Sequence, residues 1–209
     1  DDIWAVVPEL RDWTEVEWFT RTHMAFSDSL RAALESRFAQ LYLERWNQPE
    51  TAALLASVPS VMMWDDHDII DGWGSHSAEL HHSPVFQGLF QVAKAAFELF
   101  QRQMLGAPPP ATLPGQSAHS SAYRFGRTGL LVLDMRSERR PRVESTDAAG
   151  KKTVVADQVM SQTSWTAVYQ WLDARLAAGE LRHLLVMSSI PVMHPSFGQL
   201  EDAWCAAGH

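Results

Sequence analysis

The sequence predicts an α/β domain whose functional side chains lie at the carboxyl ends of strands. Short apolar runs at residues 61–64, 123–133 and 184–187 predict strands, with the middle run forming a hairpin. Longer segments with apolar residues at three- and four-residue spacing separate these runs and predict helices. Each predicted strand is followed by polar residues capable of chemistry, which is typical of strand ends in α/β domains.

Helices are expected over residues 14–56, 85–104 and 161–178. The first segment holds more than one helix: Ser27 or Asp28 is the expected N-cap of the second, and Pro49 is expected to begin a third. The strands at residues 61–64 and 184–187 are expected to be buried, because nearly all of their residues are apolar. The hairpin is expected to turn at residues 126–129, which include two glycines.

The whole chain, residues 1–209, is expected to form a single domain. Within it, residues 106–121 are rich in proline and predict a surface loop. Residues 143–156 are mostly polar and predict a second loop. Neither segment carries a motif that indicates chemistry.

Composition narrows the class of partner. The formal net charge is −8, which argues against binding to nucleic acid or to an anionic membrane, because both need a basic face. The hydrophobic fraction of 46% is ample for a large core. No apolar run approaches the roughly 18 residues of a membrane span. A single cysteine, Cys205, excludes an internal disulfide and a cysteine zinc cluster. Compartment and oligomeric state stay open.

The most unusual stretch is the run Asp65, Asp66, His67 and Asp68, directly after the first expected strand. Adjacent carboxylates repel each other unless a cation or an arginine neutralises them. A divalent metal ion would do so, because such ions take carboxylate oxygens and histidine nitrogens as ligands. The alternative is structural: a carboxylate caps a helix, its neighbour faces solvent, and the imidazole bonds to a backbone carbonyl. Spacing alone leaves both interpretations open.

Two further strand ends carry polar residues. Arg136 and Arg139 follow the hairpin, and an arginine there can hold a phosphate oxygen in a bidentate way. The alternative is an ion pair between Arg136 and Asp134. Residues 188–194, which include two serines and a histidine, follow the last strand. Because the three polar segments share a position relative to their strands, we expect them to converge on one site.

The stretch WDDHDIIDGWGS, at residues 64–75, resembles the signature of PhoD-like phosphatases, the alkaline phosphatase D branch of the calcineurin-like metallophosphoesterases. Other segments resemble the family in the same order. These are DDIW at 1–4, LLVLDMRSER at 130–139, SWTAVYQWLDARL at 164–176 and LLVMSSIPV at 184–192. The resemblance covers nearly the whole chain. It implies a metallophosphoesterase-type four-layer α/β/β/α sandwich with long helical insertions.

The same resemblance implies a metal-dependent hydrolase that acts on small phosphate esters, either monoesters or diesters, through a metal-activated water. It implies two divalent or trivalent metal ions, drawn from Fe, Mn, Zn or Ca. By position in the motif, Asp66 would be a metal ligand and His67 the proton donor to the leaving group. Asp68 would be the acid that orients His67. Asp2, in the DDIW segment, would be a further metal ligand.

On this view Arg136 and Arg139 would bind the phosphate of the substrate. Further metal ligands of the family would lie before residue 1 and after residue 209, so we expect the chain to be a piece of the domain. The alternative is a non-catalytic member of the same fold with a binding or structural role.

Overall fold

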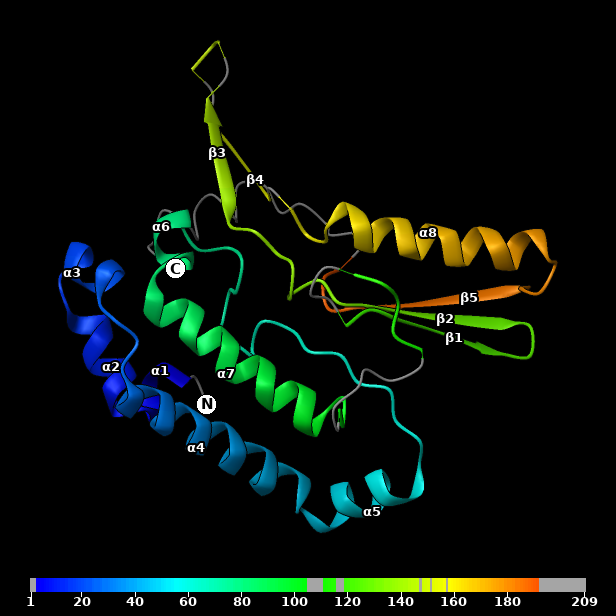
Figure 1. The fold of residues 1–209 in the computed structure, drawn as a ribbon, viewed down its shortest axis with the longest axis horizontal. Coiled ribbons are helices and arrows are strands. Elements are labelled where there is room, and N and C mark those ends of the chain that lie inside the picture. The colour runs from blue at the N-terminus through cyan, green and yellow to red at the C-terminus, as the bar shows by residue number, and fades with distance from the viewer. Residues whose placement is uncertain are drawn as a thin grey trace.

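The computed structural model describes residues 3–104, 111–115, 119–146, 148–150, 152–156 and 158–191 (Figure 1). Asp2 lies outside these residues, as do parts of the Pro-rich loop at 106–121 and the end of the segment at 188–194. The described chain combines helices with a small mixed sheet, which confirms the α/β class. The four-layer sandwich and the single domain stay predictions.

The first half of the chain is helical. Its helices are α1 (Ile3–Val6), α2 (Pro8–Glu15), α3 (Trp18–His23), α4 (Asp28–Trp46), α5 (Pro49–Ser57), α6 (Ala78–His81) and α7 (Pro84–Phe100). The long helices α4 and α7 lie side by side (Figure 1). The Ser27 hydroxyl accepts a hydrogen bond from the Leu30 N–H at the start of α4, and Pro49 stands in the first turn of α5. Both local predictions are therefore confirmed.

A hydrophobic core joins these helices. It contains buried residues of α2, α4 and α7 together with residues from the segment that follows α5. Trp64 from that segment is fully buried and stacks on Phe97 of α7, with ring centroids 4.5 Å apart. Trp73 stacks on Phe90, also of α7, at 4.7 Å. Both tryptophans are thus packing residues of the helical core.

The second half of the described chain builds the sheet. Strands β1 (Ser121–Phe125) and β2 (Thr128–Leu133) form the predicted antiparallel hairpin, and β5 (His183–Ser188) pairs with β2 in parallel. Helix α8 (Gln162–Ala177) provides the connection and covers one face of the sheet (Figure 1). A second, smaller core lies between them and includes Leu131, Leu133 and Val168. Since β2 and β5 are parallel, their carboxyl ends meet at one edge.

Two of the predicted elements are wrong. Residues 61–64 form no strand among the described residues, because their burial comes from single side chains such as Trp64 rather than from a ladder of hydrogen bonds. Residues 143–156 were expected to be a loop, but they contain an antiparallel hairpin of β3 (Arg142–Thr146) and β4 (Lys152–Ala156). The β-branched residues of this segment favour strands, and Gly150, with φ of +82°, permits the turn.

A third prediction fails at β5, which was expected to be buried. Leu184, Leu185 and Val186 are 43%, 60% and 48% exposed. The strand order is β1-β2-β5, so β5 is an edge strand of the described sheet, and no described strand pairs with its outer side. Within the described part of the chain, no helix is long and apolar enough to cross a membrane.

Candidate functional site

Residues 65–75, which we call the site loop, form a tight turn rather than a strand. The N–H groups of Ile69 and Ile70 donate to the carbonyl of Asp66, at 2.9 and 2.6 Å. One carboxylate oxygen of Asp65 accepts from the N–H of His67 at 2.9 Å, so Asp65 has a local structural role. Ile69, Ile70 and Trp73 are buried in the helical core. Their burial turns Asp66, His67 and Asp71 away from the core.

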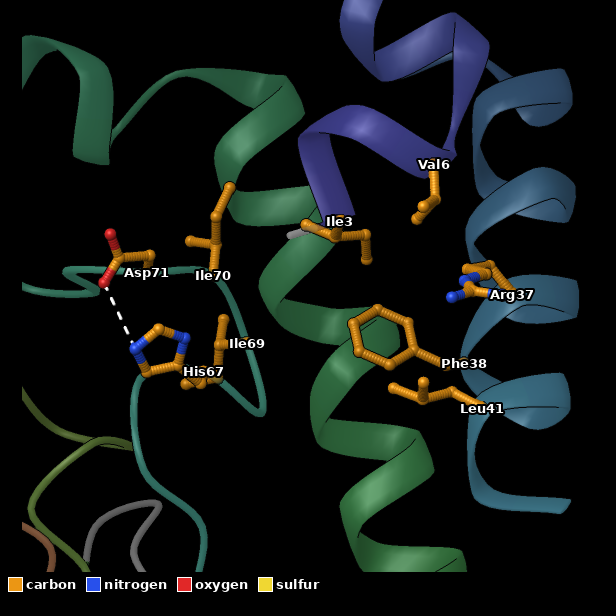
Figure 2. Close-up of a pocket in the computed structure, with 9 residues that line it drawn as sticks. All are labelled: Ile3, Val6, Arg37, Phe38, Leu41, His67, Ile69, Ile70 and Asp71. Carbon is orange, nitrogen blue, oxygen red and sulfur yellow. Dashed lines mark ion pairs between the residues drawn. The ribbon is translucent and has the colours of Figure 1, made fainter. Parts of the chain in front are cut away.

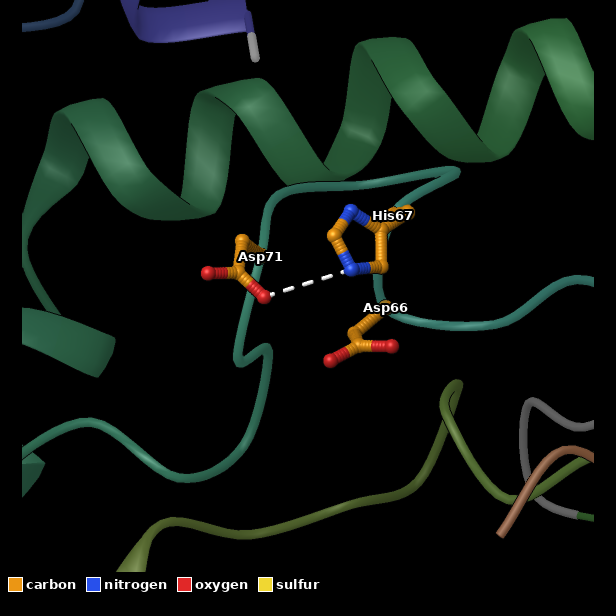
Figure 3. Close-up of side chains that lie close together, drawn as sticks. All are labelled: Asp66, His67 and Asp71. Atoms are coloured by element: carbon orange, nitrogen blue, oxygen red, sulfur yellow. Dashed lines mark ion pairs between the residues drawn. The ribbon is translucent and has the colours of Figure 1, made fainter. Parts of the chain in front are cut away.

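Three polar residues of the site loop lie together. The ligand atoms of Asp66, His67 and Asp71 lie within 4.8 Å of one another (Figure 3). His67 Nε2 is 3.4 Å from a carboxylate oxygen of Asp71, and both side chains are mostly exposed. The turn brings His67 and Asp71 together because residues four apart lie on the same side of a helical turn. This spacing is the signal in the sequence by which Asp71 could have been found.

Asp66 connects this group to the sheet. One oxygen of its carboxylate accepts from Arg136 Nη2 at 3.2 Å, and the other accepts from the Gly72 N–H at 3.0 Å. Gly72 has φ of +72°, a conformation that glycine adopts without strain. The Arg136 side chain is 8% exposed and that of Asp66 is 20% exposed. A partly buried ion pair therefore links the site loop to the end of β2.

Arg136 is placed by a buried turn that follows β2. Asp134 is fully buried, and its carboxylate accepts from Trp64 Nε1 at 2.9 Å and from the backbone N–H groups of Arg136 at 3.0 Å and His119 at 2.8 Å. The Arg136 guanidinium turns the other way and reaches Asp66, so the predicted alternative of an Arg136–Asp134 ion pair is wrong. Asp134 instead fixes the backbone from which Arg136 extends.

Arg139 lies across the site loop. Gly74 has φ of +86°, and a Cβ atom at Gly74 would stand 2.2 Å from Cδ of Arg139. Only glycine allows the arginine to pass this close. Burial lowers the pKa of Arg139, the positive charge of Arg136 lowers it further, and the negative charge of Asp66 raises it. Two guanidinium groups therefore share one small region beside one carboxylate.

This region has spare hydrogen-bond donors. Arg136 Nε, Arg139 Nε and the Ser189 hydroxyl are buried, and they find no hydrogen-bond partner among the described residues. Arg136 Nη2 also lies 3.5 Å from the Ser189 carbonyl, just after β5. The three strand-end segments predicted from sequence thus converge, through Asp66, Arg136 and Ser189. Ser189 was not predicted as a site residue on its own, since two adjacent serines give no directional signal.

Asp68 does not lie against His67, contrary to the role that the resemblance implied. Its carboxylate accepts from the Asp65 N–H at 3.0 Å and from Gln101 Nε2 at 2.8 Å. Gln101 Nε2 also lies 2.9 Å from the Tyr42 hydroxyl. Burial raises the pKa of Asp68, while the hydrogen bond from the Asp65 backbone lowers it. The tight turn sends Asp68 toward α4 and α7, and Asp71 takes the place beside His67.

The group Asp66, His67 and Asp71 fits one metal ion. Two carboxylates and one imidazole are donors that zinc, manganese and iron accept, and the exposure of His67 and Asp71 leaves positions open for water or substrate. The described residues contain one such group of potential metal ligands, whereas the resemblance implied two metal ions. Ile3 of α1 lines a small pocket together with His67 and Asp71 (Figure 2).

Fold and site define an α/β protein that presents a potential metal group beside a cluster of arginines. The profile of the PhoD related phosphatase family matches residues 1–207, so the chain belongs to that family. It is also similar to the uncharacterized protein YGR266W of Saccharomyces cerevisiae, with 25% identity over 167 residues. That alignment covers 70% of this chain and 22% of the yeast protein, so the chain spans about a fifth of the length of this relative. No solved structure matches the chain.

Proposed function

We propose that the protein hydrolyses small phosphate esters with the help of bound metal ions. The observation that carries this proposal is the position of Asp66. Asp66 belongs to the potential metal group with His67 and Asp71. It also accepts a hydrogen bond from Arg136, which lies where buried donors have no hydrogen-bond partner among the described residues. A metal ion and a phosphate group could therefore be held side by side. Membership of the PhoD related phosphatase family supports this chemistry.

Arg136 and Arg139 are the proposed phosphate-binding residues. A guanidinium offers several N–H groups in a fixed plane, which suits the oxygens of a phosphate. The unpartnered Nε atoms of both arginines and the Ser189 hydroxyl would gain partners from such an anion. Arg136 would then contact both the phosphate and Asp66, whose charge it already partly neutralises.

Asp66 is the proposed metal-holding residue on the site loop, and Asp2 stays a predicted further ligand. As the resemblance to the family implies, we expect two metal ions, each of them Fe, Mn, Zn or Ca. When bound, such an ion polarises a phosphoryl oxygen and lowers the pKa of a bound water toward neutrality. The four-layer sandwich is part of the same proposal, because it would bring further ligands to this edge of the sheet.

His67 is the proposed proton donor to the leaving oxygen. Its Nε2 lies 3.4 Å from the Asp71 carboxylate, which can hold the protonated imidazole in place by an ion pair. The ester P–O bond breaks as the leaving oxygen takes the proton from His67, and the oxygen of a water molecule bonds to phosphorus. The proton that this water loses passes to the solvent, from which His67 regains its own. General acid catalysis of this kind contributes about 10²–10⁴-fold to the rate. Asp71 would thus have the positioning role that the motif assigned to Asp68.

The alternative is a non-catalytic member of the family that binds a ligand or has a structural role. One observation favours it: the ion pair with Arg136 already neutralises Asp66 without a cation. The two functions differ in what Asp66 and His67 do. In the non-catalytic protein, neither residue would affect the rate of any hydrolysis.

The test compares the full-length protein with its His67→Ala and Asp66→Asn variants on an aryl phosphate monoester and an aryl phosphate diester. We expect His67→Ala to lower kcat by about 10²–10⁴-fold. We expect Asp66→Asn to lower the bound metal, measured by elemental analysis of the purified protein. His82→Ala is the matched control, because His82 is exposed at the end of α6 and, among the described residues, its side chain bonds to the Ala78 carbonyl. Equal rates for His67→Ala and His82→Ala would rule out the proposed proton donor.

A further inference from the structure

A groove runs between the site loop and one face of α4. It consists of two adjoining pockets that share Phe38 and Leu41 of α4 and His67 of the site loop. The smaller pocket continues along the loop to Asp71 (Figure 2). The larger, with a volume of about 220 Å³, continues along α4 to Trp46. We call the two together the α4 groove. His67 stands at the point where they meet.

The α4 wall of the groove carries two cations around an apolar centre. Arg37, Leu41 and Arg45 follow at four-residue spacing, so they form a row along one side of the helix. Arg37 is half-buried and Arg45 is exposed. Eight residues of helix separate the two arginines, which is about 12 Å. The described residues provide no carboxylate within ion-pair distance of either guanidinium. As far as the described residues are concerned, both charges are thus available to an anionic ligand.

The larger pocket has an aromatic end. Tyr42 stacks on Phe100 with centroids 4.6 Å apart, and Trp46 meets Tyr42 edge-on at 5.5 Å. Tyr42 is buried, whereas Trp46 is half-buried and lines the pocket beside Arg45. A ring or another flat apolar group could therefore lie between Leu41 and Trp46 with an acidic group near Arg45. This combination would recognise neither a simple alkyl chain nor a bare inorganic anion.

The groove also lies on the leaving-group side of the proposed reaction. Asp66 is bonded to Arg136 on one side and groups with His67 on the other. In Figure 3 Asp66 lies between His67 and the chain segment that follows β2. A phosphate held by Arg136 would therefore present its leaving oxygen to His67, and the rest of the leaving group would enter the groove that His67 lines.

We infer that the α4 groove selects phosphate esters whose leaving group carries an apolar ring and, beyond it, a second acidic group. The ring packs between Leu41 and Trp46, and the acidic group pairs with Arg45, assisted by Arg37. This inference rests on the proposed function, of which it specifies the substrate class. The acidic group is a carboxylate or a second phosphate, since both suit a guanidinium.

The test uses three aryl esters: phenyl phosphate, 4-carboxyphenyl phosphate and 1,4-phenylene bisphosphate. For each protein we measure kcat/KM for an acidic ester and divide it by kcat/KM for phenyl phosphate. The leaving groups differ in reactivity, but this difference is the same for every variant and cancels when the ratios are compared. We expect Arg45→Gln to lower the ratio by up to about fivefold, the upper end for an exposed ion pair, and the double variant Arg37→Gln/Arg45→Gln to lower it further. The acidic ester whose ratio falls more in Arg45→Gln shows whether the groove prefers a carboxylate or a second phosphate. Arg31→Gln is the matched control on α4, because Arg31 lies over Phe26, outside the groove.

A second measurement does not depend on hydrolysis. Binding of the product alcohol 4-hydroxybenzoate is followed by calorimetry, and we expect it to weaken by up to about fivefold in Arg45→Gln and to stay unchanged in Arg31→Gln. If no ester is hydrolysed but this binding pattern holds, the proposed function fails and the groove keeps its ligand class. If Arg45→Gln matches Arg31→Gln in both the ratio and the binding, the inference about the groove is overturned whatever the activity.

Discussion

The site loop and β5 contribute to the same site, but they are held in place in opposite ways. The loop is anchored by apolar side chains in the helical core, where Trp64 is fully buried and Trp73 is 2% exposed. Strand β5 is held by its ladder with β2 and by contacts at its carboxyl end, while Leu185 in its middle is 60% exposed. One wall of the site is thus set by packing and the other by backbone hydrogen bonds.

The difference explains how the polar residues are oriented. In the site loop, burial of Ile69, Ile70 and Trp73 forces Asp66 and His67 outward, so the geometry of the potential metal group depends on a rigid core. On the sheet side, the position of Arg136 depends on the bonds to the buried Asp134, and the neighbouring Met135 packs into the smaller core. The Arg136–Asp66 ion pair joins the two walls.

The largest expected loss of stability comes from a substitution in the site loop, which is anchored by packing in the helical core. Trp73→Ala should lower the free energy of unfolding by about 3–5 kcal/mol, because it removes a buried ring that stacks on Phe86 and Phe90 and leaves a cavity. It also removes the hydrogen bond from Trp73 Nε1 to the Arg136 carbonyl. Urea unfolding measures the loss. Trp18→Ala is the control, since Trp18 is 39% exposed, and it should cost under about 1 kcal/mol. Equal losses would contradict the packing account.

Features fixed by local interactions were predictable from the sequence. The cap at Ser27 and the helix start at Pro49 depend on neighbouring residues alone, and both were predicted. The packing role of Trp64 and Trp73 follows from their size and the apolar residues around them. The convergence of the segments after β2 and β5 was also predicted, because parallel strands bring their carboxyl ends to one edge. The site loop joins them although the strand predicted before it does not form.

Features that depend on non-local partners were not predictable. Whether β5 is buried depends on what lies beyond it in space, and an apolar run cannot distinguish a central strand from an edge strand. The position of Asp71, rather than Asp68, beside His67 depends on the chain forming a turn, where the fourth residue along is a neighbour of His67. The Arg136–Asp66 pair joins residues 70 positions apart, and the sequence offered Asp134 as the nearer candidate.

A smaller effect is expected from His81, which should make the stability of the helical core depend on pH. His81 is buried against Trp73, with ring centroids 4.7 Å apart, and burial, followed by the positive charges of His82 and His76, lowers its pKa to about 4. The unfolded chain binds the proton with a pKa near 6.5, so between pH 6.5 and pH 4 it holds more protons than the folded chain. Stability should therefore fall as the pH falls through this window, by up to about 3 kcal/mol.

Replacing the buried imidazole isolates this contribution. His81→Phe keeps an aromatic ring against Trp73 and removes the titrating group, so its stability should change less between pH 7 and pH 4.5 than that of the unmodified protein. His23→Gln, at an exposed position on α3, is the control for the loss of a histidine. Urea unfolding at a series of pH values measures both. A His81→Phe variant that keeps the full acid loss would show that other groups cause it.

The smallest expected loss of stability comes from a substitution in β5, which is held by its hydrogen bonds to β2. Leu185→Thr should change the free energy of unfolding by less than about 0.5 kcal/mol, because the side chain is 60% exposed and threonine also favours strands. Val132→Thr is the internal comparison, since Val132 in β2 is fully buried and the change places a hydroxyl in an apolar core. It should cost about 1–3 kcal/mol in the same urea titration. A loss at Leu185 as large as that at Val132 would mean that this face of β5 is covered in the protein, and the contrast between the two walls would then disappear.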